Sequence, residues 1–192
     1  VEIADTAANV AGSLERKTLL ARLSRGFSFA NSTAAATAAS SLNDLANRSI
    51  EDIGDEIGGF HIDRVRLEEA VRRKVRESRF AFIRGLPGSG KSAVLKRLAN
   101  DAIEAGPILF LHSTRVTGSS WNEFSAALNL GNVSLPEILA EIGYTGTPTL
   151  FIDGIDRLNA SARQVAADII RTILSDPDLA SWNVVATVRD EG

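Results

Sequence analysis

Short apolar runs alternate with amphipathic helical patterns along the chain from residue 60 onward. Four such runs, at 80–83, 108–111, 149–152 and 184–188, predict buried β-strands. Helical spacing before and between them predicts inward-facing residues at Leu67, Val71 and Val75; at Leu95, Leu98, Ala99 and Ala102; at Leu135, Ile138, Leu139 and Ile142; and at Val165, Ile169 and Ile173. Strands that are apolar on both faces and alternate with helices favour a parallel sheet covered on both sides. We therefore predict an α/β fold with three layers.

Polar residues at the ends of these segments indicate where two of the helices begin and end. Ser134 and Glu137 have the spacing of a capping box, and that helix is expected to stop at Gly143. The last predicted helix opens at Ser161 and ends at Asp176, which precedes a proline.

Residues 1–59 carry helical patterns but no recognisable chemistry. One helix is expected around Leu14, Leu19, Leu20 and Leu23, and a second around Ala35, Ala38, Ala39, Leu42, Leu45 and Ala46. The segment 28–39 is rich in Ala, Ser and Thr, so a flexible linker fits it equally well. A third short helix is expected from a Ser49 cap to Gly58-Gly59. We predict a helical N-terminal region or linker over 1–59 and a core domain over 60–192.

The composition is that of an ordinary globular chain and excludes several classes of site. The absence of cysteine excludes disulfides, zinc-thiolate sites and thiol catalysis, and neither His61 nor His112 has partners at metal-ligand spacing. The apolar runs are too short to cross a bilayer and no signal peptide is visible, so we expect a cytoplasmic protein without membrane contact. The sequence contains no Met, which suggests a segment of a longer chain.

Segment 85–92 matches the phosphate-binding pattern G-x-x-x-x-G-K-[ST] at every fixed position. Glycines let backbone N–H groups surround phosphate oxygens, the lysine reaches the β- and γ-phosphates, and the serine hydroxyl suits Mg²⁺. The competing interpretation is an ordinary glycine-rich turn between a strand and a helix. We assign nucleotide binding to Gly85, Pro87, Gly88, Ser89, Gly90, Lys91, Ser92 and Ala93.

Two carboxylates follow the third predicted strand. Asp153 is expected at the carboxyl end of the sheet, where ligands of such folds bind, and is assigned with Ser92 to a Mg²⁺ site. Asp156 is assigned the orientation or deprotonation of an attacking water; the alternatives are a helix cap or an ion pair with Arg157.

The last strand ends in polar residues that can reach the same site. Thr187 or Arg189 is expected to sense the γ-phosphate, and the alternative for Arg189 is a surface ion pair. A net charge of −3 gives no reason to expect a nucleic-acid partner. The basic stretch from Arg64 to Arg79 leaves that partner open, although interleaved glutamates indicate a solvated helix face.

Taken in this order and spacing, the three motifs resemble the STAND class of P-loop NTPases, which includes NACHT and NB-ARC proteins. The segment 151–156 is similar to the acidic strand of NACHT proteins, except that Arg157 stands where that family has another acid. Segment 187–190 is similar to the NB-ARC sensor, and segment 62–67 to the element that places an arginine, here Arg64, near the adenine. The resemblance covers about residues 60–192 and implies that a last strand and a helical lid would follow.

The resemblance implies an ATP-driven switch within a larger signalling or defence protein. Its partners would be ATP, Mg²⁺, other domains of the same chain and, on activation, further copies of itself. The alternatives are a motor or remodelling ATPase of the AAA+ type, a nucleotide-binding scaffold without turnover, and a small-molecule kinase. Arg157 in place of an acid leaves hydrolysis open.

Overall fold

The computed structural model describes residues 33–57, 60–61, 64–144 and 146–190. The helix expected around Leu14 to Leu23 lies outside these ranges. By contacts within the chain, Ser32–Gly192 forms one compact unit. Among the described residues, no helix is both long enough and apolar enough to cross a membrane.

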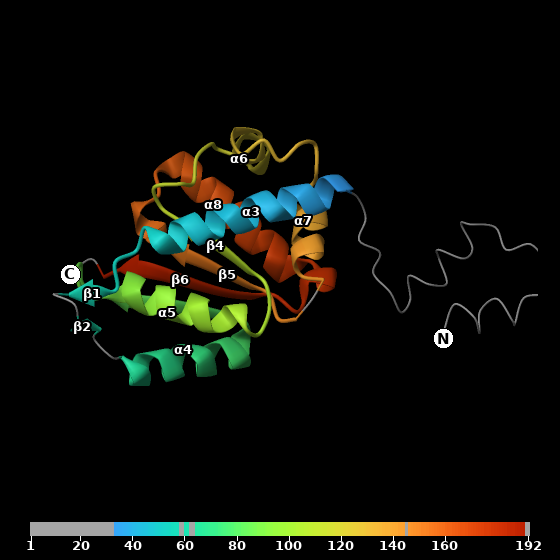
Figure 1. The fold of residues 1–192 in the computed structure, drawn as a ribbon. Coiled ribbons are helices and arrows are strands. Elements are labelled where there is room, and N and C mark those ends of the chain that lie inside the picture. The colour runs from blue at the N-terminus through green and yellow to red at the C-terminus, as the bar shows by residue number, and fades with distance from the viewer. Residues whose placement is uncertain (1–32, 58–59, 62–63, 145, 191–192) are drawn as a thin grey trace, which may run out of the picture. The chain divides into compact units, whose positions relative to one another are not determined.

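A four-stranded parallel sheet forms the centre of this unit (Figure 1). Its strands are β3 (Phe80–Gly85), β4 (Ile108–His112), β5 (Thr149–Asp153) and β6 (Asn183–Arg189). Their order across the sheet is β3-β6-β5-β4, so the last strand lies between the first and third of the four. All four predicted strands and their parallel arrangement are confirmed.

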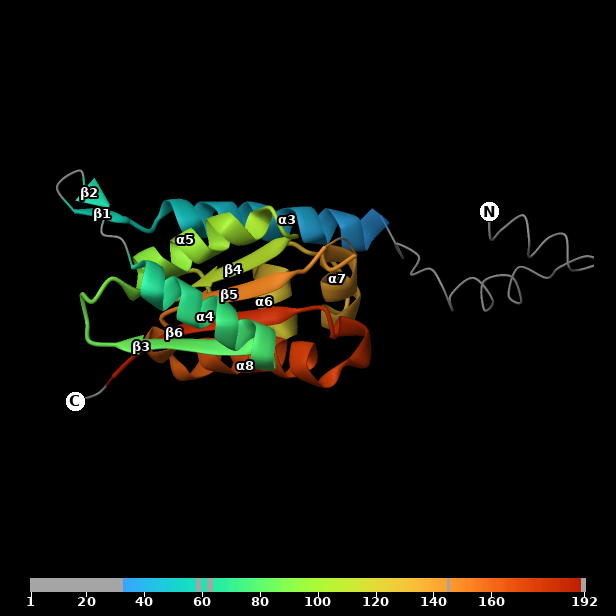
Figure 2. The same ribbon diagram turned by 90° about the horizontal axis from the view of Figure 1, so that it is seen from below.

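Helices cover both faces of the sheet (Figure 2). One face carries α4 (Val65–Ser78) and α5 (Lys91–Ile103), and the other carries α6 (Trp121–Ala127), α7 (Leu135–Ile142) and α8 (Ala160–Ser175). Each strand packs against helices on both faces of the sheet, because alternate side chains point to opposite faces. In β4, Leu109 and Leu111 join the α7 and α8 side, whereas Ile108 and Phe110 join the α4 and α5 side. The three-layer α/β fold is therefore confirmed.

Helix α3 (Thr33–Glu51) packs along the edge strand β4 and against α7. Its buried residues continue the predicted 3–4 spacing. They join the same hydrophobic clusters as the strands and the helices that cover the sheet. The boundary expected between residues 59 and 60 stays a prediction. The predicted helix starting at Ser49 is wrong, because Ser49 lies inside α3, where its buried hydroxyl donates to the Leu45 carbonyl at 2.7 Å.

The chain after α3 forms two short antiparallel strands, β1 (Glu56–Ile57) and β2 (Phe60–His61), before it enters α4.

The capping box of α7 is confirmed, with Ser134 and Glu137 bonding each other's backbone N–H groups. Helix α8 starts earlier than predicted, because the Asn159 side chain accepts from Ala162 N–H at 2.8 Å and acts as its cap. Its end at Asp176 is confirmed.

Candidate functional site

The segment 86–90 connects β3 to α5 at the carboxyl edge of the sheet. Gly88 and Gly90 have φ values of 74° and 80°, which residues other than glycine rarely adopt. Gly90 is the residue before the first turn of α5, so the N–H groups of that turn face the loop. The local structure is therefore the strand, glycine loop and helix that a phosphate-binding nest requires.

Lys91 folds back over the loop that precedes it. Its ammonium donates to the Gly85 carbonyl at 2.7 Å and to the Leu86 carbonyl at 2.8 Å. These two contacts hold the cation against the loop, and Lys91 also lines the cavity described below.

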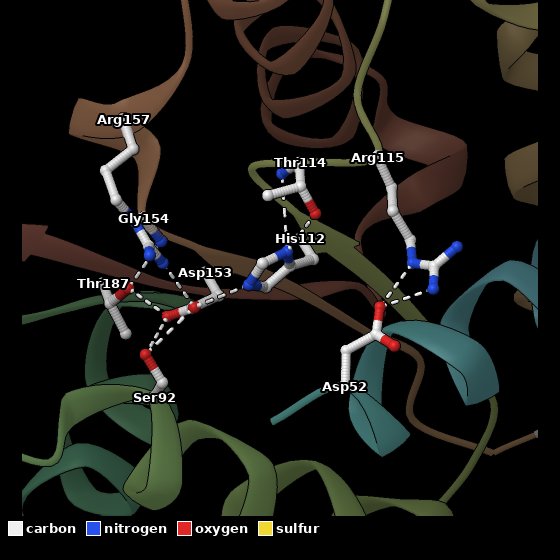
Figure 3. A network of polar contacts seen from close by, with 9 residues as sticks. All are labelled: Asp52, Ser92, His112, Thr114, Arg115, Asp153, Gly154, Arg157 and Thr187. Atoms are coloured by element: carbon white, nitrogen blue, oxygen red, sulfur yellow. Dashed lines mark hydrogen bonds and ion pairs between the residues drawn. The ribbon is translucent and has the colours of Figure 1, made fainter. Parts of the chain in front are cut away.

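Asp153, at the end of β5, is the centre of a buried hydrogen-bond network (Figure 3). The carboxylate is 1% exposed and accepts from the Ser92 hydroxyl, at 2.9 Å to Oδ1 and 3.0 Å to Oδ2. Thr187, at the end of β6, donates to Oδ1 at 2.7 Å, and its own hydroxyl accepts from Gly154 N–H at 2.7 Å. Asp153 thus joins the start of α5 to two neighbouring strands.

Arg157 provides the positive charge opposite this buried carboxylate. Its Nη2 lies 2.7 Å from Asp153 Oδ2. The ion pair that we considered from the sequence, between Asp156 and Arg157, is therefore replaced by one between Arg157 and Asp153. The Arg157 side chain is 35% exposed and also lines the cavity described below.

His112, at the end of β4, lies beside the same carboxylate, with Nε2 3.5 Å from Asp153 Oδ2. Its Nδ1 contacts the Thr114 hydroxyl at 2.7 Å and accepts from Thr114 N–H at 3.4 Å. Burial lowers the pKa of His112, although the Asp153 charge raises it. A neutral ring that accepts at Nδ1 carries its proton on Nε2, facing Asp153.

Asp156 and Arg189 contact each other rather than the Asp153 network. Arg189 N–H donates to Asp156 Oδ1 at 3.1 Å, and Arg189 Nε lies 3.5 Å from Oδ2. Asp156 belongs to the short 3₁₀-helix η1 (Ile155–Arg157), directly after β5. The carboxylate expected to activate a water is therefore engaged by the last strand, and Arg189 has the ion pair considered as its alternative.

A cavity of about 320 Å³ opens over the phosphate loop. Its lining includes five cationic and two acidic side chains: Arg64, Lys91, Arg97, Arg157 and Arg189 against Asp55 and Asp156. Such an excess of positive charge favours a polyanionic ligand. The Arg64 guanidinium lies over Gly90, where an added Cβ would approach it to 3.2 Å. Arg64 is thus located beside the phosphate loop.

The described residues contain no group of three or more His, Asp or Glu side chains that would hold a metal alone. The Ser92 hydroxyl and the Asp153 carboxylate are oxygen donors in contact with each other, as a Mg²⁺ ion shared with phosphate oxygens and water would require. The donor types therefore fit this ion.

Most of the residues assigned from the sequence gather around the cavity. Its lining contains Arg64, Pro87, Gly88, Gly90, Lys91, Ser92, Ala93, Asp156 and Arg189, whereas Gly85 at the end of β3, Ser89 in the loop and the buried Asp153 do not line it. Sequence reasoning missed Arg97 and His112. His112 directly follows an apolar strand, as Asp153 does, and this position was the available signal.

Comparisons with known proteins identify no family for this chain. No protein-family model matches it, and no curated protein matches it. Among solved structures, 57 chains match. One of them, titled "Structure of C. elegans PCH-2", is 15% identical with a TM-score of 0.36, covering 84% of this chain. This chain spans 38% of the length of that one. At this TM-score the likeness carries no argument about function.

Proposed function

We propose that this chain binds ATP with Mg²⁺ as a P-loop nucleotide-binding domain. One observation carries the proposal: Ser92, the last residue of the phosphate-loop motif, hydrogen-bonds Asp153 at the end of a separate strand. A turn that served only to connect a strand to a helix would not need this contact. The cationic cavity above the loop supports the proposal, because a triphosphate carries the complementary charge.

In this proposal, different residues contact different parts of the ligand. N–H groups at the start of α5 and the Lys91 ammonium bind the β- and γ-phosphates. Ser92 and Asp153 hold Mg²⁺, which screens the phosphate charge when bound. Arg64 lies beside the loop, in place to contact the phosphates or the sugar.

We expect slow ATP hydrolysis, as a molecular switch or a nucleotide-binding scaffold would have. Three carboxylates of the described residues lie at the site: Asp153 is buried and paired with Arg157, Asp156 is paired with Arg189, and Asp55 is paired with Lys96. Membership of the STAND class and a remodelling ATPase of the AAA+ type both remain predictions. Stimulation of phosphate release by a protein or nucleic-acid substrate would favour the remodelling ATPase.

Substitution of Lys91 tests the proposal. Titration of the 192-residue chain with a fluorescent ATP analogue and Mg²⁺ should show binding that weakens at least about tenfold in Lys91→Ala, since charge-assisted phosphate contacts are strong. Lys74→Ala is the matched control, because Lys74 is exposed on α4 and pairs with Glu77. Thermal unfolding checks that both variants fold. Equal affinity in wild type and Lys91→Ala would overturn the proposal.

A further inference from the structure

The Asp153 carboxylate already has a positive partner that belongs to the chain. A charge that is 1% exposed is stable only when it is paired, and the partner here is the Arg157 guanidinium at 2.7 Å. Among the described residues, Arg157 is the one permanent cation in contact with this carboxylate. The same carboxylate is the proposed magnesium ligand. Arg157 and Mg²⁺ would therefore both have to pair with Asp153.

The turn after β5 is built to hold Arg157 in this position. Gly154 has a φ of 71°, and the 3₁₀-helix Ile155–Arg157 then returns residue 157 to Asp153. Arg157 N–H donates to the Gly154 carbonyl at 2.9 Å, which closes the turn. A Cβ on Gly154 would collide with the guanidinium, so the glycine also leaves the space that the side chain occupies (Figure 3).

The second side of Arg157 faces the cavity. The guanidinium lines it together with Lys91 and Arg189, and about a third of the side chain is exposed. A planar guanidinium can bond a carboxylate and a phosphate oxygen at once, or exchange one for the other. Arg157 is therefore placed to neutralise phosphate charge, as a bound metal ion otherwise would.

We propose that the Arg157 guanidinium competes with Mg²⁺ for the Asp153 carboxylate and so weakens the dependence of nucleotide binding on magnesium. This inference rests on the proposed function. A dication placed beside Asp153 would meet the positive charge of Arg157 at short range, and the repulsion offsets the gain from the carboxylate. With a neutral side chain at position 157, the carboxylate would be free to attract the metal.

The test compares ATP affinity with Mg²⁺ and with EDTA, by equilibrium titration of the 192-residue chain. In wild type the two affinities should agree within about threefold, and in Arg157→Gln magnesium should strengthen binding by about tenfold or more. The double variant Asp153→Asn with Arg157→Gln should lose that gain. Arg171→Gln is the matched control, because Arg171 lies on α8, is 66% exposed and pairs with Asp168.

The outcomes separate the two proposals. If wild type and the Arg171→Gln control both fail to bind ATP in either buffer, the proposed function itself is wrong. If wild type binds and magnesium strengthens its binding about as much as that of Arg157→Gln, the competition is overturned. A gain that persists in the double variant would also overturn it, because the metal would then act away from Asp153. Unfolding curves in EDTA establish that each variant is folded before titration.

Discussion

The Thr187 hydroxyl lies 2.7 Å from Asp153 Oδ1 and 2.7 Å from Gly154 N, so it joins β6 to the end of β5. The amide can only donate, and the hydroxyl therefore gives its single proton to the carboxylate. Thr187 is 1% exposed, and water cannot replace either contact. The threonine that we expected to sense the γ-phosphate is thus also a structural partner of the acid.

Thr187→Val should destabilise the fold by about 1–3 kcal/mol, because it leaves a buried N–H without an acceptor and removes a donor from a buried carboxylate. Thr187→Ser keeps the hydroxyl and should lose less. Urea unfolding followed by circular dichroism measures both. A valine variant as stable as wild type would show that the hydroxyl contributes nothing to the strand ends.

Arg157→Glu should be less stable at pH 7 than Arg157→Gln, by roughly 1–3 kcal/mol. Glutamate both removes the cation opposite Asp153 and places a second negative charge next to it. Urea midpoints at pH 7 give the comparison, and a glutamate variant of equal stability would contradict the ion pair.

Asp156→Asn should leave ATP affinity within a few-fold of wild type and lower any phosphate release by roughly 10²–10⁴ if Asp156 acts as the base. The Asp156 contacts with Arg189 argue for a smaller change, because they hold the carboxylate against the last strand. Single-turnover phosphate release decides the matter. An unchanged rate would assign Asp156 to positioning β6 alone.

Ser134→Ala should destabilise the fold by about 1 kcal/mol, because the hydroxyl caps α7. Its partner Glu137 has a lowered pKa, owing first to the Ser134 side chain and then to the Ser134 N–H. A lowered folded pKa means that this contribution is present above the unfolded value of 4.5 and is lost as the pH falls below it. Glu137→Gln should therefore flatten the stability profile below pH 4.5, as thermal unfolding across pH 3–7 would show.

The strands and the phosphate loop were predictable because each is a local pattern. An apolar run such as 149–152 needs no partner to be recognised, and the loop motif is contiguous. The position of α3 was not predictable, since amphipathic spacing shows that a face is buried without showing against what. The cap of α8 was misplaced by two residues because Asn159 and Ser161 are both good caps.

The interior of the site depended on long-range geometry. Thr187 and Asp153 are 34 residues apart in sequence, and their contact follows from the strand order, which no local pattern specifies. Arg157 is only four residues from Asp153, but the pair forms through a 3₁₀ turn after a strand rather than through a helix. The ion pair between Arg157 and Asp153 was therefore not predicted, although Arg157 was noted as standing where the similar family has an acid.

The order β3-β6-β5-β4 has a consequence for how the molecule is assembled. Of the four described strands, β6 is the last along the chain, and β3 and β5 cannot complete a common sheet until it is inserted between them. Because β6 also supplies Thr187, the loop after β3 and the acid at the end of β5 are brought into register only when β6 pairs with both strands. The geometry of the proposed nucleotide site therefore depends on long-range strand pairing, and it cannot form before the chain has been made as far as β6.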